Sequence, residues 1–396
     1  MLNLNTVLER KKPLFEQDYA AHYTDLCEAQ RSARVLVIGG AGSIGQAVVK
    51  ELFALQPSVL HVVDLSENGL VELVRDIRSS LGYIDGDFRT FALDYGQPEF
   101  AAMVAAHGPY DYVANLAALK HVRSERDPYT LMRLTRVNVL HTVQSLHIAG
   151  AAGVQKYFAV SSDKAANPFN MMGASKRIME MYLAGHAGSL PISTARFANV
   201  AFSNGSLLDG FRYRLLKRQP LSAPTDVKRY FVTEQEAGRL CLLSLILGKN
   251  KEIFFPKAPE ELHLVSFADI AQRFLQSRGY EPYMCSSEEE AREYLKASSA
   301  KDRWPLYTFS SDTTGEKPFE EFYTNQEEVD WGRFAELAVV ENTLEIDPAL
   351  LRRFLERIEE LLSSGMWNKA DLIGAYSWLL PQFAHIETGR SLDDKM

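Results

Sequence analysis

Cysteine is scarce in this chain of 396 residues, and the three that occur, Cys27, Cys241 and Cys285, lie far apart. An odd, widely spaced set builds neither a disulfide framework nor a Cys-x-x-Cys metal site. The histidines show no metal-ligand spacing either, so no metal centre is expected. This cysteine usage is typical of a reducing compartment, and we predict a cytoplasmic location.

Long apolar runs and an excess of positive charge are also missing. The most apolar stretch, residues 240–247, is far shorter than the ~20 residues that cross a bilayer. The first ten residues carry charges and lack the apolar core of a secretion signal, so we predict neither secretion nor a membrane span. The 43 Lys and Arg against 51 Asp and Glu give a net charge of −8. This sign disfavours nucleic acid as a partner, because its phosphates require a basic face.

Hydrophobic residues, in contrast, make up 46% of the chain, which is enough for a sizeable core. From residue 34, the run VLVIGG precedes a helical stretch and a second strand-like run, VLHVVD. Strand and helix patterns then alternate, which predicts an α/β fold with a doubly wound parallel sheet of the Rossmann type. We predict an N-terminal helical extension (1–33), a Rossmann domain (34–203), a smaller α/β lobe with C-terminal helices, interleaved with that domain (204–384), and a tail (385–396).

The string GGAGSIG places Gly39, Gly42 and Gly45 between the first strand and its helix. The first glycine permits a tight turn, the second lets backbone amides approach a pyrophosphate, and the third lets the helix pack closely on the sheet. Asp64 ends the second strand, where a carboxylate would bind the adenine-ribose hydroxyls and repel a 2′-phosphate. The pattern therefore predicts NAD as cofactor. Its predicted ligands are Gly39, Gly42, Ser43, Ile44, Gly45, Asp64 and, for the adenine, Asp94, for which an exposed loop acid is the competing interpretation.

The stretch SSDKAANPFNMMGASK contains the candidate catalytic groups. In short-chain dehydrogenases a Tyr and a Lys lie four residues apart on one helix face, and the Lys lowers the pKa of the Tyr. Here Lys176 fits the lysine, but Met172 occupies the tyrosine position and its thioether cannot exchange a proton. Ser162, Asp163 and Lys164 follow a predicted strand, and they place an acid and a base at the carboxyl edge of the sheet.

The same stretch resembles the S-T-D-K-A-x-N-P-x-N-x-M-G-x-[ST]-K signature of the CapD-like polysaccharide biosynthesis family. These are UDP-N-acetylglucosamine 4,6-dehydratases of the extended short-chain dehydrogenase/reductase superfamily. RFANVAFSNGS, KRYFVTEQEA and TTGEKPFEEF are similar too, so the resemblance covers roughly residues 34–384. It implies a lyase that oxidises C4 of the sugar with NAD, removes water across C5–C6 and returns the hydride to C6. The product would be a UDP-4-keto-6-deoxy-N-acetylhexosamine for surface polysaccharide.

The resemblance also implies residue roles. Asp163 would protonate the departing 6-hydroxyl and accept the 4-hydroxyl proton, directly or through water, while Lys164 would remove the proton at C5. Ser162, with Ser161 as a second hydroxyl, would orient the 4-hydroxyl, and Lys176 would hold the nicotinamide ribose. The predicted substrate ligands are Lys120, Asn199 and the diphosphate clamp Arg229, with Glu316 and Lys317 organising the substrate lobe.

Alternatives remain open at this point. Asn115 and Ala198 stand where the family commonly has His and Gly, and both are expected to flank the sugar pocket, so the exact sugar is undetermined. One alternative function is a nucleotide-sugar 4-epimerase, which Met172 disfavours because such enzymes use the tyrosine as base. Another is a non-catalytic protein that binds NAD or a nucleotide sugar. By resemblance, helices near residues 127–149 and 174–187 are expected to form the interface of a homo-oligomer.

Overall fold

The computed structural model describes residues 4–186, 188, 190–257, 262, 264–297, 302–311, 319–341, 346–383 and 385. Glu316, Lys317 and most of the predicted C-terminal tail lie outside the described residues.

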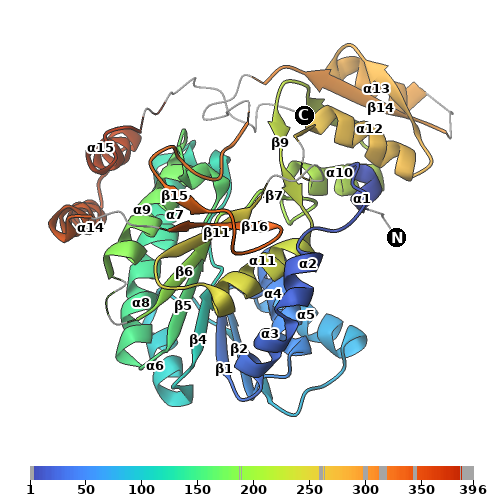
Figure 1. The fold of residues 1–396 in the computed structure, drawn as a ribbon. Helices are drawn as coiled ribbons and strands as arrows, with labels where there is room; N and C mark the ends of the chain where they lie inside the picture. Colours follow the sequence, from blue (N-terminus) through green and yellow to red (C-terminus); the bar gives the residue numbers. More distant parts are fainter. Residues whose placement is uncertain are drawn as a thin grey trace.

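A nine-stranded sheet forms the centre of the molecule (Figure 1). Its strands are β1 (Arg34–Ile38), β2 (Val59–Asp64), β3 (Asp87–Ala92), β4 (Tyr112–Asn115), β5 (Lys156–Val160), β6 (Ile192–Ala195), β11 (Glu252–Pro256), β15 (Glu328–Asp330) and β16 (Leu337–Glu341). The order is β15-β16-β11-β6-β5-β4-β1-β2-β3, and of these nine strands β16 is the one that runs in the opposite direction, antiparallel to both β11 and β15. The predicted doubly wound α/β fold is confirmed. The strand order reverses between β1 and β4, and open parallel sheets bind ligands at this place.

Helices cover both faces of the large sheet. They are α4 (Ser43–Ala54), α5 (Glu67–Ser80), α6 (Pro98–His107), α7 (Pro128–Thr135), α8 (His141–Ala151), α9 (Met171–His186) and α11 (Glu234–Leu247). Along β1, Val35 and Val37 join the core beneath α4 and α11, whereas Leu36 and Ile38 join the core beneath α6 and α8. Because successive strand residues point to opposite faces, burial on both faces explains the unbroken apolar run VLVI.

A smaller lobe lies beyond the carboxyl ends of the strands (Figure 1). It contains α1 (Leu4–Val7), α10 (Leu207–Leu216), α12 (Phe267–Ser277), α13 (Glu288–Ala297), β8 (Leu221–Pro224), β13 (Glu281–Cys285) and β14 (Arg303–Phe309), with the pairs β7 (Asn199–Val200) and β10 (Phe231–Val232), and β9 (Lys228–Arg229) and β12 (Val265–Ser266). The chain leaves the large sheet after β6, returns for α11 and β11, and returns again for β15 and β16. The exact domain boundaries stay a prediction.

The N-terminal extension, which includes α2 (Glu16–Ala21) and α3 (Tyr23–Gln30), is held to the large sheet and its covering helices by two buried charged residues, Arg10 and Asp18. The guanidinium of Arg10 donates to both carboxylate oxygens of Glu236 in α11 at 2.9–3.0 Å. The carboxylate of Asp18 accepts three consecutive backbone N–H groups, those of residues 335–337, at the start of β16. The extension is therefore an integral part of the fold.

Two C-terminal helices, α14 (Pro348–Ser364) and α15 (Lys369–Leu379), pack against α7 and α9. Gly365 ends α14 with a φ of 66°, as its position in the sequence predicts. The hydroxyl of Tyr182 in α9 donates to the carbonyl of Leu351, and the hydroxyls of Thr135 and Tyr376 lie 2.9 Å apart. These helices cover part of the surface expected to bind a partner subunit, and the oligomeric state stays a prediction. Within the described part of the chain, no helix combines the length and the apolar character needed to span a bilayer.

Candidate active site

The glycine loop between β1 and α4 leaves room for a ligand at one of its three spaced glycines. Gly39 has a φ of 79°, and a Cβ there would lie 2.5 Å from the backbone nitrogen of Ala117. A Cβ on Gly45 would lie 2.1 Å from the carbonyl oxygen of Gly39. A Cβ on Gly42 would meet only that carbonyl, at 3.6 Å, so close packing within the protein does not account for this glycine. Gly42 provides no side-chain cap for α4, and the loop therefore fits a pyrophosphate at the start of the helix.

Asp64 is held beside this loop at the end of β2. One carboxylate oxygen accepts the backbone N–H of Ala41 at 2.9 Å, and the other accepts the N–H of Ser66 at 2.8 Å. Asp94 follows the adjacent strand β3, where its carboxylate accepts the N–H of Gly96 and lies 3.7 Å from Nδ1 of His141. Both acids thus lie at the sheet edge where the sequence places them.

Two predicted ligands from separate motifs meet at the turn that leads into the smaller lobe. Oγ of Ser43, in the first turn of α4, accepts the backbone N–H of Asn204 at 2.9 Å. Nζ of Lys120, after β4, donates to Oγ of Ser203 at 3.2 Å, and burial lowers the pKa of this lysine. Ile44 is half-buried and packs against the core. The cofactor loop and the sugar-side lysine therefore contact the same short segment.

Ser162, Asp163 and Lys164 lie together just after β5. The carboxylate of Asp163 is buried, and one of its oxygens accepts three hydrogen bonds. They come from Oγ of Ser162 at 2.9 Å, the backbone N–H of Lys164 at 2.9 Å and Nζ of Lys164 at 3.1 Å. The predicted acid and the predicted base therefore form an ion pair.

Lys176 and Met172 lie one helical turn apart in α9, and both are buried. Nζ of Lys176 donates to the carbonyl of Val160 at 2.8 Å, which places the ammonium at the end of β5. Burial lowers the pKa of Lys176 to about 8, although the negative charge of Glu180 acts to raise it. Met172 adds apolar bulk and no ionisable group.

Ser161 does not face the site with Ser162. Its hydroxyl donates to Glu180, which also accepts from the fully buried guanidinium of Arg196 at 2.7 and 2.9 Å. Arg196 donates in addition to Glu327 at 2.7 and 2.8 Å. Burial alone would raise the pKa of Glu327, but the hydrogen bonds and charge of Arg196 lower it to about 2. The prediction that Ser161 orients substrate is therefore wrong.

The side chain of Asn115 is also turned away from the site. Its amide donates to the hydroxyls of Tyr157 at 3.0 Å and Thr142 at 3.3 Å, and its oxygen accepts the N–H of Ala117. The expectation that Asn115 flanks the sugar pocket is wrong, since its amide links β4 to β5 and α8.

Arg229 and Asn199 lie at the entry to the smaller lobe. Asn199 begins β7 and is half-buried, and its backbone N–H donates to the carbonyl of Tyr230 at 3.0 Å. Arg229 is buried, and its guanidinium donates to the carbonyl of Lys228 and lies 3.9 Å from a carboxylate oxygen of Glu320. That same oxygen lies 3.8 Å from Nζ of Lys164. Glu320 lies in the sequence TTGEKPFEEF, which by itself predicts no role for this carboxylate.

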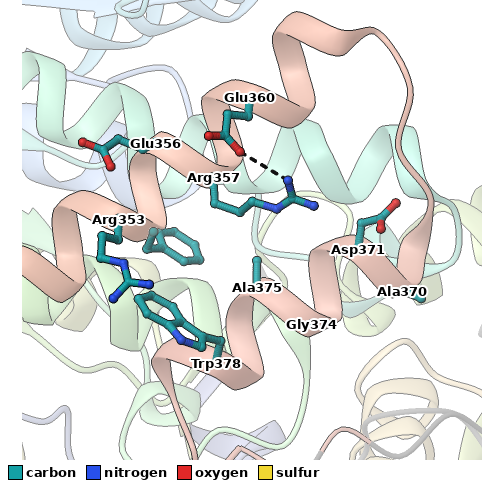
Figure 2. Close-up of a pocket in the computed structure, with 10 residues that line it drawn as sticks. Arg353, Glu356, Arg357, Glu360, Ala370, Asp371, Gly374, Ala375 and Trp378 are labelled. Carbon is teal, nitrogen blue, oxygen red and sulfur yellow. Dashed lines mark hydrogen bonds and ion pairs between the residues drawn. The ribbon is translucent and has the colours of Figure 1, made fainter.

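A hollow elsewhere on the surface lies between α14 and α15 (Figure 2). All its lining residues come from these two helices, and Arg353 lies over the ring of Trp378. None of the predicted cofactor, substrate or catalytic residues contributes to this hollow, so we place the site at the sheet edge.

Comparison with known proteins shows to which family the chain belongs. A family model described as polysaccharide biosynthesis protein matches residues 35–342. The chain is 31% identical over 271 residues to an uncharacterized membrane protein of Methanocaldococcus jannaschii, covering 66% of this chain and 77% of that protein. It is 27% identical over 331 residues to the probable polysaccharide biosynthesis protein EpsC of Bacillus subtilis, covering 83% of this chain and 51% of EpsC. The chain thus spans about half the length of EpsC.

One further relative and two solved structures complete the comparison. The chain is 26% identical over 234 residues to an inverting UDP-N-acetylglucosamine 4,6-dehydratase of Campylobacter jejuni, covering 57% of this chain and 67% of that enzyme. Its fold is similar to that of Pen from Bacillus thuringiensis, with a TM-score of 0.63 at 21% identity over 83% of this chain and 98% of Pen. It is also similar to the dTDP-glucose 4,6-dehydratase DesIV of Streptomyces venezuelae, with a TM-score of 0.53 at 20% identity over 70% of this chain and 88% of DesIV. With a family model that covers more than three quarters of its length, the chain belongs to the polysaccharide biosynthesis protein family.

Proposed function

We propose that this protein dehydrates UDP-N-acetylglucosamine to a UDP-4-keto-6-deoxy-N-acetylhexosamine for the synthesis of surface polysaccharide. The observation that carries the proposal is the Asp163–Lys164 pair at the end of β5, beside Met172 where related dehydrogenases have a proton-transferring tyrosine. Similarity to EpsC and to the Campylobacter dehydratase supports it. We place the reaction in the cytoplasm, where the three free cysteines would stay reduced.

The site fits NAD as the cofactor. The amides beside Gly42 would hold the pyrophosphate, Asp64 the adenine ribose, Asp94 the adenine, and Lys176 the nicotinamide ribose. NAD, when bound, would supply the hydride acceptor and donor for C4 and C6.

The chain's own residues would move the protons. Once C4 is a ketone, the proton on C5 is acidic, and Lys164 in its neutral form would remove it. C5 would be protonated again as C6 receives the hydride. Asp163 would protonate the departing 6-hydroxyl, and, through water, would accept the 4-hydroxyl proton that Met172 cannot take. Ser162 donates to Asp163 and accepts the backbone N–H of Lys164, so its hydroxyl is fixed beside both groups.

Incubation of the pure protein with NAD and a panel of UDP-sugars tests the proposal. We expect UDP-N-acetylglucosamine to lose the mass of one water, and NMR of the product to report the 4-ketone and the configuration at C5. A product of unchanged mass but altered C4 configuration would identify a 4-epimerase. Binding of UDP-sugars without any turnover would identify a non-catalytic binding protein.

Lys176 gives a pH-dependent prediction for cofactor binding. Its pKa of about 8 means that the ammonium is charged at pH 7 and neutral at pH 9. Deprotonation removes the charge and one of three donors, so we expect NAD affinity to fall several-fold between pH 7 and pH 9. Isothermal titration calorimetry at both pH values measures this change. The variant Lys176→Met should bind NAD more weakly than the wild type at pH 7, and its NAD affinity should be the same at pH 9. If NAD affinity fell equally in both proteins between pH 7 and pH 9, Lys176 would be excluded as the source of the change.

A further inference from the structure

We propose that Glu320 is a positioning residue that couples recognition of the substrate diphosphate to the acid–base pair. The inference rests on the proposed function, because it takes Arg229 as the diphosphate ligand and Asp163 and Lys164 as acid and base.

The geometry places Glu320 between two groups assigned to different tasks. Its carboxylate is only 5% exposed, and the same oxygen lies 3.8 Å from Nζ of Lys164 and 3.9 Å from the guanidinium of Arg229. Lys164 in turn donates to Asp163 at 3.1 Å. Asp163, Lys164, Glu320 and Arg229 therefore form a continuous row of charges that alternate in sign, which we call the four-charge row. All four side chains are at most 13% exposed, so solvent screens their interactions weakly.

The backbone on both sides of the four-charge row is held by the buried Arg196 network. Arg196 donates to the carbonyl of Phe322, two residues after Glu320, at 2.9 Å, and to the carboxylate of Glu327. Glu180, which belongs to the same network, accepts a hydrogen bond from the hydroxyl of Ser161, two residues before Asp163. One buried arginine thus fixes the segment that carries Glu320 relative to the segment that carries Asp163.

A diphosphate would redistribute the contacts of the row. A guanidinium binds phosphate oxygens in bidentate fashion, and the carboxylate of Glu320 repels the same phosphates. When Arg229 binds the diphosphate, Glu320 turns to Lys164 as its cationic partner. Lys164 is then drawn from Asp163 toward Glu320, and the contact between Lys164 and Asp163 opens. The carboxylate of Asp163 then becomes available to take the 4-hydroxyl proton and to pass it to the departing 6-hydroxyl.

This coupling predicts opposite effects on binding and turnover in Glu320→Gln, which preserves shape and removes charge. We expect kcat for the UDP-sugar to fall about 100-fold, because Lys164 stays with Asp163. We expect UDP alone to bind about threefold more tightly, because a carboxylate that competes for Arg229 and repels phosphate is gone. Steady-state kinetics and calorimetric titration with UDP measure the two effects.

Glu321→Gln is the matched control, because Glu321 is the exposed neighbour and its contact with Asn167 can be kept by the amide oxygen. It should behave as the wild type, and Glu320→Asp should recover part of kcat. Weaker UDP binding together with lower kcat in Glu320→Gln would indicate a merely structural role and overturn the inference, as would unchanged kcat. If the wild type dehydrates no UDP-sugar, the proposed function is wrong. In that case the role of the Arg229–Glu320 contact in UDP binding is tested separately, and equal UDP affinities of the wild type and Glu320→Gln would contradict it.

Discussion

Replacing Asp163 by Asn should lower kcat for UDP-sugar dehydration about 1000-fold while NAD and UDP bind as they do to the wild type. The substitution preserves size, and the amide oxygen can still accept the bonds that Ser162 and Lys164 donate. An amide cannot deliver a proton to the departing hydroxyl, and loss of a general acid typically costs about 10²–10⁴ in rate.

The measurement is kcat together with the dissociation constants for NAD and UDP. Ser162→Ala is the companion variant, since it removes one hydrogen bond to Asp163 but keeps the acid, and we expect a loss of about tenfold. An unchanged kcat in Asp163→Asn would exclude Asp163 as the acid. Loss of NAD binding with unchanged melting temperature would instead show that Asp163 supports the cofactor.

Replacing Arg196 by Met should lower the free energy of unfolding by about 3 kcal/mol, because two buried carboxylates lose their fully buried cation and keep only Arg177, which is 16% exposed. Arg196, Glu180 and Glu327 have side chains that are 0%, 1% and 3% exposed, so water cannot take over the hydrogen bonds. Urea unfolding followed by circular dichroism measures the change. Arg357→Met is the matched control, since Arg357 and Glu360 form a pair on α14 that is more than half exposed (Figure 2), and its loss should cost less than about 1 kcal/mol.

The same network has a pH signature. The pKa of Glu327 is lowered to about 2 in the folded protein, from an ordinary value of 4.5 for a glutamate. The stability it contributes is therefore fully present above pH 4.5 and is lost as the pH falls toward 2. In Arg196→Met this part of the acid destabilisation should become smaller, because only Arg177 then remains to lower the pKa of Glu327. Equal unfolding energies for the Arg196→Met and Arg357→Met variants would contradict the role of the network.

The sheet and the glycine loop could be predicted from the sequence, because the patterns that indicate them are local. The glycine spacing and the unbroken apolar strands each occupy fewer than ten residues, and the carboxyl ends of parallel strands meet at one edge. The direction of the Ser161 side chain could also have been predicted from the sequence. Adjacent residues at a strand end point to opposite sides, so Ser161 and Ser162 could not both face the substrate.

The carboxylates Glu320 and Glu327 could not be placed from sequence, because no periodicity links them to Lys164 or Arg196. They approach those residues only through the crossovers that return the chain to the large sheet. Glu180 is a different case, since it lies four residues after Lys176 in α9 and thus on the same face. The sequence therefore predicts the position of Glu180 on α9, but it does not predict that Arg196 is its partner.

The helices α14 and α15 also have a consequence for the growing chain on the ribosome. Thr135 and Tyr376, whose hydroxyls meet, are 241 residues apart. Because a chain is synthesised at about 5–20 residues per second, α14 and α15 are completed on the order of 10–50 s after α7, whose apolar side chains they help to cover. Leu131 and Met132 share one core with these helices and with α9, so until α14 and α15 emerge, that part of their cover is missing and can be taken by chaperones or other nascent chains.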